Sequence, residues 1–386
     1  MPVRRTGLMI LSCVILLTGC IDPFDTGLRD NQSSLVVEAV ITDRPGEQTI
    51  YLSHSSPIND TAFNAETGAY VTVSNDLGSV KEFVESKPGV YTTQMSADDL
   101  VVGASYWLNI VSSDGVLYES DAEQLPLPGP PVDSIYWEFE TEGTADRHEP
   151  LNGIRFYMDM LGEEDQPRNF RWELEETWIY YSVWYIDYIF TGVLQQFPDP
   201  WSLNACWSTE KIHQIYTAST SASVSNTITG FPLHFVSEET HRLQTRYSLL
   251  VKQYTLSDFA YNYWKQVREQ NQGSGGIYEK QPDYISGNIY NTGDPNERVL
   301  GYFNVSSLSE KRIFVSGVRE LVYPVTNCTI YTIWRPRDKP LWMQVPFYLV
   351  SFDPTRQGGP PYGVGVNLCF DCRNGGGTTD KPDFWK

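Results

Sequence analysis

Short runs in which apolar and polar residues alternate follow one another along residues 33–125. A period of two is typical of strands that bury one face. The runs lie at residues 35–41, 49–53, 70–74, 81–84, 90–93, 105–110 and 116–120. The run at 81–84 has the least complete alternation. We therefore expect about seven strands in this part of the chain.

Turn signals separate several of these runs. They are Arg44–Gly46, Asp76–Gly78, Lys87–Gly89 and Asp114–Gly115. Glycine, proline and aspartate in these places favour tight turns. The number and spacing of the strands predict an immunoglobulin-like or transthyretin-like β-sandwich at residues 33–125.

A proline-rich segment follows the predicted sandwich. Residues 126–131 read Pro-Leu-Pro-Gly-Pro-Pro. Proline cannot donate to a central strand or continue a helix, so the segment predicts a stiff connector and a domain boundary. A larger β-rich domain is then expected over residues 132–386, with strands at 132–137, 153–158, 170–175, 247–254 and 312–316.

One prominent helix is predicted near residues 257–270. Ser257 is a favourable N-cap and Asp258 complements the positive end of the helix dipole. One helical face then carries Phe259, Ala260, Tyr263, Trp264 and Val267. An apolar stripe at this spacing predicts packing against the core of the domain. The fold class is therefore mainly β with one helix.

Aromatic residues are concentrated between Trp172 and Trp207. Within this segment they occupy both faces of any strand, which a half-buried strand does not require. One interpretation is a surface for a partner or ligand, since aromatic side chains dominate such contacts. The candidate residues are Trp178, Tyr180, Tyr181, Trp184, Tyr185 and Tyr188. The alternative is a strand buried on both sides, or a long hairpin that packs on the first domain.

The first twenty residues carry an export signal. Arg4 and Arg5 precede a short apolar run that ends in Leu-Thr-Gly-Cys at Cys20. The run is too short for a membrane span, which needs about 20 residues. The pattern is typical of a bacterial lipoprotein signal. We expect cleavage after residue 19, acylation of Cys20, and a short polar tether over residues 20–32.

The residues after Cys20 bear on the final location of the protein. Ile21, rather than aspartate, follows the acylated cysteine and favours the outer membrane. Asp22 and Asp25 fit either an acidic surface-export signal or an ordinary acidic linker. We therefore expect an outer-membrane protein that faces the cell surface, with the periplasmic face as the alternative.

The charge of the chain excludes one class of partner. The chain contains 28 Lys+Arg and 48 Asp+Glu, a formal net charge of −20. Loss of Arg4 and Arg5 with the signal makes the mature charge −22. A surface this acidic, without a basic patch, repels nucleic acid.

Four cysteines remain after the signal and Cys20 are set aside. They are Cys206, Cys328, Cys369 and Cys372. An even number in an exported protein predicts two disulfides, and three pairings are open. A four-cysteine zinc site and redox chemistry at Cys369-x-x-Cys372 are the alternatives.

No motif of a known catalytic or cofactor site is present in the sequence. The five histidines show no HExxH spacing, and no Gly-x-Ser-x-Gly or phosphate-binding loop occurs. We expect no metal, no cofactor and no catalytic residues. Glu173, Glu175 and Glu176 lie beside the aromatic residues and keep one lesser alternative open, a hydrolase that uses paired carboxylates.

Several landmarks occur in a characteristic order. After Cys20 they are residues 35–43, 88–91, 249–254 and 299–303, then Cys369-x-x-Cys372 and residues 381–385. In this order they resemble Bacteroidota lipoproteins of the domain-of-unknown-function family 4249 (DUF4249). Members are typically encoded beside TonB-dependent outer-membrane transporters. The resemblance supplies no catalytic residues.

The sequence and the resemblance together favour one function. We expect a non-enzymatic outer-membrane lipoprotein that acts as an accessory binding or assembly partner of a TonB-dependent β-barrel transporter. An independent surface lipoprotein that binds a glycan or peptide is the alternative, and the carboxylate-based hydrolase is a lesser one.

Overall fold

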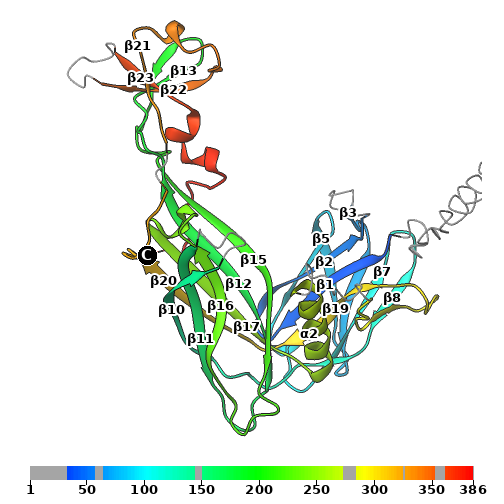
Figure 1. The fold of residues 1–386 in the computed structure, drawn as a ribbon. Coiled ribbons are helices and arrows are strands. Elements are labelled where there is room, and N and C mark those ends of the chain that lie inside the picture. Colours follow the sequence, from blue (N-terminus) through cyan, green and yellow to red (C-terminus); the bar gives the residue numbers. More distant parts are fainter. Residues whose placement is uncertain are drawn as a thin grey trace, which may run out of the picture.

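The computed structural model describes residues 33–56, 64–143, 150–272, 284–324, 327–352 and 361–385. The predicted signal at 1–19, the tether at 20–32 and Cys20 lie outside these residues. The described chain is mainly β and forms two sandwiches and a small cap (Figure 1). Within the described ranges, no helix combines the length and hydrophobicity that a membrane crossing needs.

The first sandwich contains all seven strands that the alternating pattern predicts, including the one at 81–84. Its strands are β1 Leu35–Thr42, β2 Gly46–His54, β3 Asn64–Ala65, β4 Tyr70–Asn75, β5 Val80–Lys87, β6 Val90–Met95, β7 Ser105–Val111, β8 Leu117–Ser120, β9 Glu123–Gln124, β18 Ile289–Asn291 and β19 Leu300–Ser306. A short 3-10 helix, η1, spans Ala97–Asp99. The main strand order is β18-β8-β7-β4-β5-β6-β2-β1-β19.

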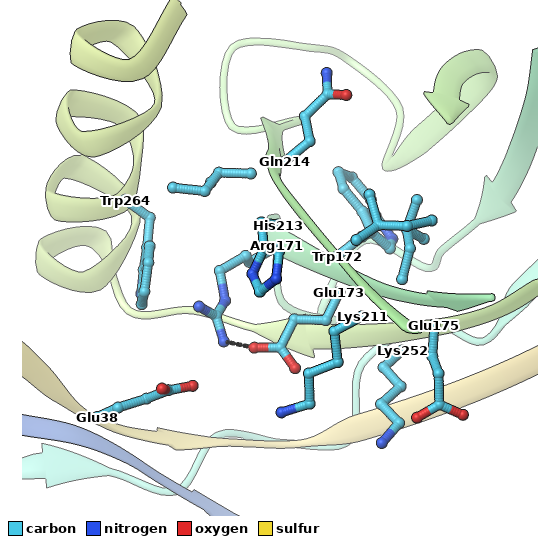
Figure 2. A pocket seen from close by; sticks show the side chains of 13 residues that line it. Glu38, Arg171, Trp172, Glu173, Glu175, Lys211, His213, Gln214, Lys252 and Trp264 are labelled. Atoms are coloured by element: carbon cyan, nitrogen blue, oxygen red, sulfur yellow. Dashed lines mark hydrogen bonds and ion pairs between the residues drawn. The ribbon is translucent and has the colours of Figure 1, made fainter. Parts of the chain in front are cut away.

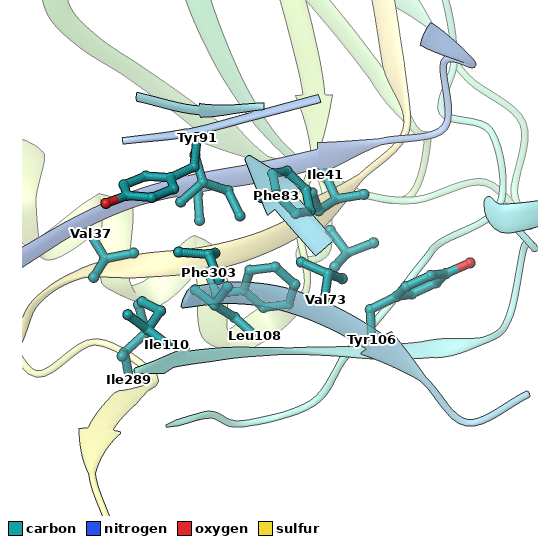
Figure 3. Packing of buried hydrophobic residues seen from close by; sticks show 14 of the residues in the cluster. Val37, Ile41, Val73, Phe83, Tyr91, Tyr106, Leu108, Ile110, Ile289 and Phe303 are labelled. Atoms are coloured by element: carbon teal, nitrogen blue, oxygen red, sulfur yellow. The ribbon is translucent and has the colours of Figure 1, made fainter. Parts of the chain in front are cut away.

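Alternation along the strands builds the core of this sandwich (Figure 3). In β1, the side chains of Leu35, Val37, Ala39 and Ile41 are buried, and the residues between them are more exposed. Phe303 of β19 packs into the same core. Burying a side chain of this size contributes about 1.5–3 kcal/mol, so β19 is an integral part of the sandwich.

Two strands of the first sandwich come from residues far beyond the predicted boundary at 126–131. β18 pairs antiparallel with β8, and β19 pairs parallel with β1. The structural unit is therefore not the continuous segment 33–125, and residues 289–306 do not belong to the second sheet system. Periodicity reports the face that a strand buries but not its neighbour, so the sequence pattern could not show this return.

The second sandwich has two antiparallel sheets around its own core. The first sheet contains β10 Val132–Glu142, β11 Leu151–Leu161 and β16 Thr227–Ser237. The second contains β15 Ala205–Ser219, β12 Asn169–Tyr181, β17 Arg246–Thr255 and β20 Leu308–Ser316. A 3-10 helix, η2, spans His241–Leu243. All five strands expected in this part of the chain are present.

Residues 126–131 form no regular element and are held against the second sandwich. The amide of Gly129 donates to Ser307 Oγ at 3.0 Å, and Gln253 Nε2 donates to the carbonyl of Pro130 at 2.6 Å. Ser307 is also the single residue between β19 and β20. Its backbone exchanges hydrogen bonds with Thr255, so two of the connections between the sandwiches, residues 126–131 and Ser307, are fixed at one point.

Helix α2 spans Asp258–Gln272 and confirms the predicted helix. Ser257 Oγ accepts from the amide of Ala260 at 3.1 Å, as an N-cap should. Ala260 is fully buried, and Tyr263 and Trp264 pack beside Tyr302. The expected core contact of Phe259 is wrong, because this side chain is 81% exposed. It lies at the edge of the apolar stripe.

The cap lies beyond one end of the second sandwich, away from the first (Figure 1). We define it as residues 182–204, 327–352 and 361–377. Its strands are β13 Tyr188–Phe190, β14 Leu194–Gln196, β21 Tyr331–Ile333, β22 Phe347–Ser351 and β23 Tyr362–Val364. Its 3-10 helices are η3 Pro336–Asp338, η4 Asn367–Cys369 and η5 Cys372–Gly375. The strands form one sheet in the order β14-β13-β22-β23-β21.

Candidate functional site

Two disulfides fix the cap, which confirms the structural interpretation of the four cysteines. Cys206 of β15 is bonded to Cys372 of η5, and Cys328 is bonded to Cys369 of η4. The first bond ties the cap to the second sandwich, and the second closes the cap on itself. Cys369 and Cys372 have different partners, so the CxxC spacing is not a redox pair. No thiolate is left for a four-cysteine zinc site.

The predicted aromatic residues do not form one continuous surface. Trp178 packs at the border of the second core, with the guanidinium of Arg242 4.9 Å from its ring centre. Tyr180 contacts the end of the cap through its phenol, which donates to the carbonyl of Cys372 at 2.9 Å. Tyr181 is 51% exposed.

The other three candidates pack inside the cap. Trp184 and Tyr185 join the cluster around Phe370, and Tyr188 joins the cluster around Phe347. Four of the six side chains therefore pack against the second core or within the cap, Tyr180 links sandwich and cap through a hydrogen bond, and only Tyr181 is largely exposed.

The cap nevertheless exposes aromatic side chains that the sequence pattern did not single out. Trp201, Trp334 and Trp342 are 60%, 63% and 51% exposed. They are the only tryptophans of the described chain that are more than about a third exposed, and all belong to the cap. Further exposed apolar side chains of the cap are Val183, Val193, Tyr331, Leu341, Val345, Phe352, Val366 and Leu368. Exposed apolar residues gathered in one region mark an interaction surface.

Few charges interrupt this surface. The basic residues of the cap are Arg335, Arg337, Lys339 and Arg373, and its acidic residues are Asp187, Asp199, Asp338 and Asp371. The cap is therefore formally neutral, whereas the whole chain carries −20. Depletion of charge is typical of the centre of a protein interface, because little has to be desolvated on binding.

The buried Asp371 of the cap organises the turn that carries Cys372. Its carboxylate caps η5 by accepting from the amide of Arg373 and pairs with the Arg373 guanidinium at 2.8 Å. The Tyr348 hydroxyl donates to the same carboxylate. Burial opposes ionisation of Asp371, but these hydrogen bonds outweigh it and lower the pKa of the carboxyl. Asp371 thus has a structural role.

A second buried polar cluster lies beneath Trp178. Glu176 accepts from the Tyr247 hydroxyl at 2.9 Å and pairs with Arg242, and His234 Nε2 lies 3.8 Å from the carboxylate. Burial raises the pKa of Glu176 despite the attraction of Arg242. Burial, together with the charges of Arg242 and Arg155, lowers the pKa of His234 to about 4.

The carboxylates considered for hydrolysis are each paired with an arginine. Glu173 pairs with Arg171, Glu175 lies 3.5 Å from Arg312, and Glu176 pairs with Arg242. These pairs fit a structural ion-pair network better than the free acid and base of glycoside hydrolysis. Among the described residues, no group of three or more His, Cys, Asp or Glu side chains could hold a metal ion.

The signal for the exposed tryptophans lies in residues 334–346, where Trp334 and Trp342 occur among prolines and basic residues without strand periodicity. Leu341 and Val345 of this segment are exposed as well, whereas Met343 is buried in the core of the cap. A pocket of about 270 Å³ between the sandwiches was also missed, and none of the six predicted aromatic residues lines it.

The fold and the candidate site together define the class of this protein. It has two β-sandwiches and a disulfide-linked cap that exposes aromatic side chains. The chain belongs to the family described as Domain of unknown function (DUF4249), whose model matches residues 21–312. The matched range includes β13 and β14 of the cap and ends before β21, β22 and β23.

Other comparisons are less informative. No curated protein sequence matches the chain. One similar solved structure is trypsin-activated alpha-2-macroglobulin from Escherichia coli, with 7% sequence identity and a TM-score of 0.18. The alignment covers 58% of this chain and 14% of that one. A similarity this low carries no inference about function.

Proposed function

We propose that the protein is a non-enzymatic outer-membrane lipoprotein whose cap docks on a TonB-dependent β-barrel transporter. The observation that carries the proposal is the gathering of Trp201, Trp334 and Trp342 on the neutral, disulfide-linked cap. The expected acylation of Cys20 and the family membership support the outer-membrane location and the kind of partner.

Low net charge and a disulfide-linked backbone make the cap suited to binding a partner. Tryptophan is enriched among the residues that dominate binding energy at interfaces. The cap lacks a net charge, so a partner does not have to strip water from a strongly acidic surface. Its two disulfides restrain the backbone of the cap, which reduces the entropy lost on binding.

Affinity purification from detergent-solubilised outer membranes tests the docking. The wild type should co-purify with a β-barrel transporter. The amount of transporter that co-purifies with a Trp334→Ser/Trp342→Ser variant should be at least tenfold lower. Phe259→Ser is the matched control, since it removes an exposed aromatic side chain from α2 rather than from the cap. Purification of the wild type without a β-barrel protein contradicts the proposal. Equal amounts of transporter with the tryptophan variant and with Phe259→Ser contradict it as well.

The anchor is tested separately. A Cys20→Ala variant should leave the membrane fraction, whereas a Cys13→Ala variant, altered within the predicted signal, should stay there. Protease treatment of whole cells then distinguishes the two faces of the outer membrane, because only a surface-facing protein is cleaved.

A second function is favoured by the same exposed tryptophans, which can also stack on sugar rings. In that case the protein itself captures a glycan or peptide at the cell surface. Glycan arrays with the wild type and the Trp334→Ser/Trp342→Ser variant distinguish this function, which requires binding by the wild type that the variant loses.

A further inference from the structure

The pocket between the two sandwiches is lined by no residue of the cap and has its own set of charges (Figure 2). Its walls come from β12, β15 and β17 of the second sandwich, from Trp264 of α2, and from Glu38 of β1. Its volume of about 270 Å³ is just below the range of drug-sized sites, which is about 300–1,000 Å³. The size therefore suits a small ligand.

An irregularity in strand pairing forms one wall. Trp172 pairs with Tyr216 and Leu174 with Ile212, so the three residues 213–215 stand opposite Glu173 alone. All three line the pocket. Bulges of this kind bend a strand and redirect its side chains, and they are common beside binding sites.

Arg171 is held rigidly at the pocket. Its side chain is only 7% exposed, and its guanidinium lies 4.0 Å from the ring centre of Trp264 and 5.2 Å from that of Tyr254. One terminal nitrogen pairs with Glu173. Its Nε is buried without a hydrogen-bond partner. Glu173 compensates the charge of the guanidinium, but a buried N–H without an acceptor is costly.

Two opposite charges at the pocket have no ion-pair partner among the described residues. Glu38 approaches from the first sandwich and Lys211 from the second (Figure 2). The Lys211 ammonium lies 5.9 Å from the ring centre of Tyr51. Neighbouring charges are paired instead, since Lys252 lies 3.9 Å from Glu310 and Glu175 lies 3.5 Å from Arg312.

We propose that this pocket binds a small zwitterion, a free amino acid or short peptide with an apolar side chain. The ligand's ammonium pairs with Glu38, and its carboxylate pairs with Lys211 and the buried Arg171. The apolar side chain lies against the indole of Trp264. This ligand satisfies both uncommitted charges at once, whereas a neutral sugar leaves both unpaired.

Calorimetric titration of the full-length protein in detergent with L-leucyl-L-leucine tests the proposal. Wild type should bind it, and the blocked analogue N-acetyl-L-leucyl-L-leucine amide should bind at least tenfold more weakly. Glu38→Gln and Lys211→Met should each weaken binding of the free dipeptide at least tenfold. Glu82→Gln and Lys87→Met are matched controls on exposed positions of β5 and should bind normally.

A ligand modified at one end separates recognition from misfolding. Wild type should prefer free L-leucyl-L-leucine over its N-acetyl derivative, and Glu38→Gln should lose this preference because its partner charge is gone. Absence of dipeptide binding to the wild type overturns the proposal. Equal binding of the free and blocked ligands overturns it as well. The cap variants should bind the dipeptide normally, so docking and ligand binding fail independently.

Discussion

The phenol of Tyr180 donates a hydrogen bond to the backbone carbonyl of Cys372, although 192 positions separate the two residues. The same oxygen accepts from the amide of Gly377 at 2.9 Å. Tyr180 stands at the end of β12, and Cys372 begins η5. One side chain of the second sandwich thus supports the turn that carries a disulfide of the cap.

Removing that oxygen should loosen the turn. Tyr180→Phe leaves the Cys372 carbonyl and the Gly377 amide without this partner, at a cost of about 1–3 kcal/mol. The amide of Gly377 should exchange with deuterium faster, which mass spectrometry of the terminal peptide measures. Tyr181→Phe is the matched control, because no hydrogen bond of its hydroxyl is present among the described residues. Equal exchange in both variants would contradict the assignment.

Gly301 should be irreplaceable in β19. Its φ is +109°, and a Cβ there would lie 1.9 Å from the carbonyl oxygen of Val37 on β1. Gly301→Ala must separate the parallel pair, at an expected cost of about 3 kcal/mol or more. Gly192 has a φ of +106° with open space around it, so Gly192→Ala tests the backbone strain alone. In denaturant unfolding, the free energy of unfolding of Gly301→Ala should be well below that of Gly192→Ala.

Acid should destabilise the second sandwich through His234. Burial and two arginine charges lower its pKa to about 4, while the unfolded chain binds a proton near 6.5. The unfolded state therefore takes up the proton first, and stability falls as pH drops from about 6.5 to about 4. The loss amounts to roughly 3 kcal/mol. His234→Asn should flatten this part of the stability curve, and the exposed His241→Asn should not.

Glu123 should change the stability with pH in the direction opposite to His234. Burial raises the pKa of its carboxyl, although the hydroxyls of Tyr302 and Ser257 donate to it. The folded state favours the protonated form, so stability falls as pH rises through the ordinary carboxyl pKa. Glu123→Gln keeps the acceptor oxygen and cannot ionise, so it should be more stable than the wild type at pH 8 and gain little at pH 4. The exposed Glu47→Gln should be neutral at both values.

The sequence was informative wherever local periodicity decides the structure. The strands at 35–41 and 90–93 and the helix capped by Ser257 follow from neighbouring residues, and so does their burial except at Phe259. The return of β19 to β1 does not, because strand pairing depends on contacts between distant residues. Nothing near Gly301 in the chain indicates Val37 as its partner.

In the candidate site too, some features depend on neighbouring residues and others on contacts between distant residues. Aromatic density allowed either a partner surface or a buried strand at Trp184 and Tyr188, and it could not separate packed side chains from exposed ones. Exposure of Trp334 depends on how the cap closes. The pocket at Glu38 and Lys211 depends on the placement of two sandwiches, which no local pattern encodes.

The parallel pairing of β1 with β19 also governs the order in which the protein can mature. The ribosome must synthesise some 260 residues after β1 before its partner strand exists. Until then one edge of the first sandwich, including the carbonyl of Val37, is open to any other strand. A chain stopped near residue 130 should therefore aggregate or be degraded rather than accumulate as a domain. The newly made chain needs protection of that edge until its own later segment arrives.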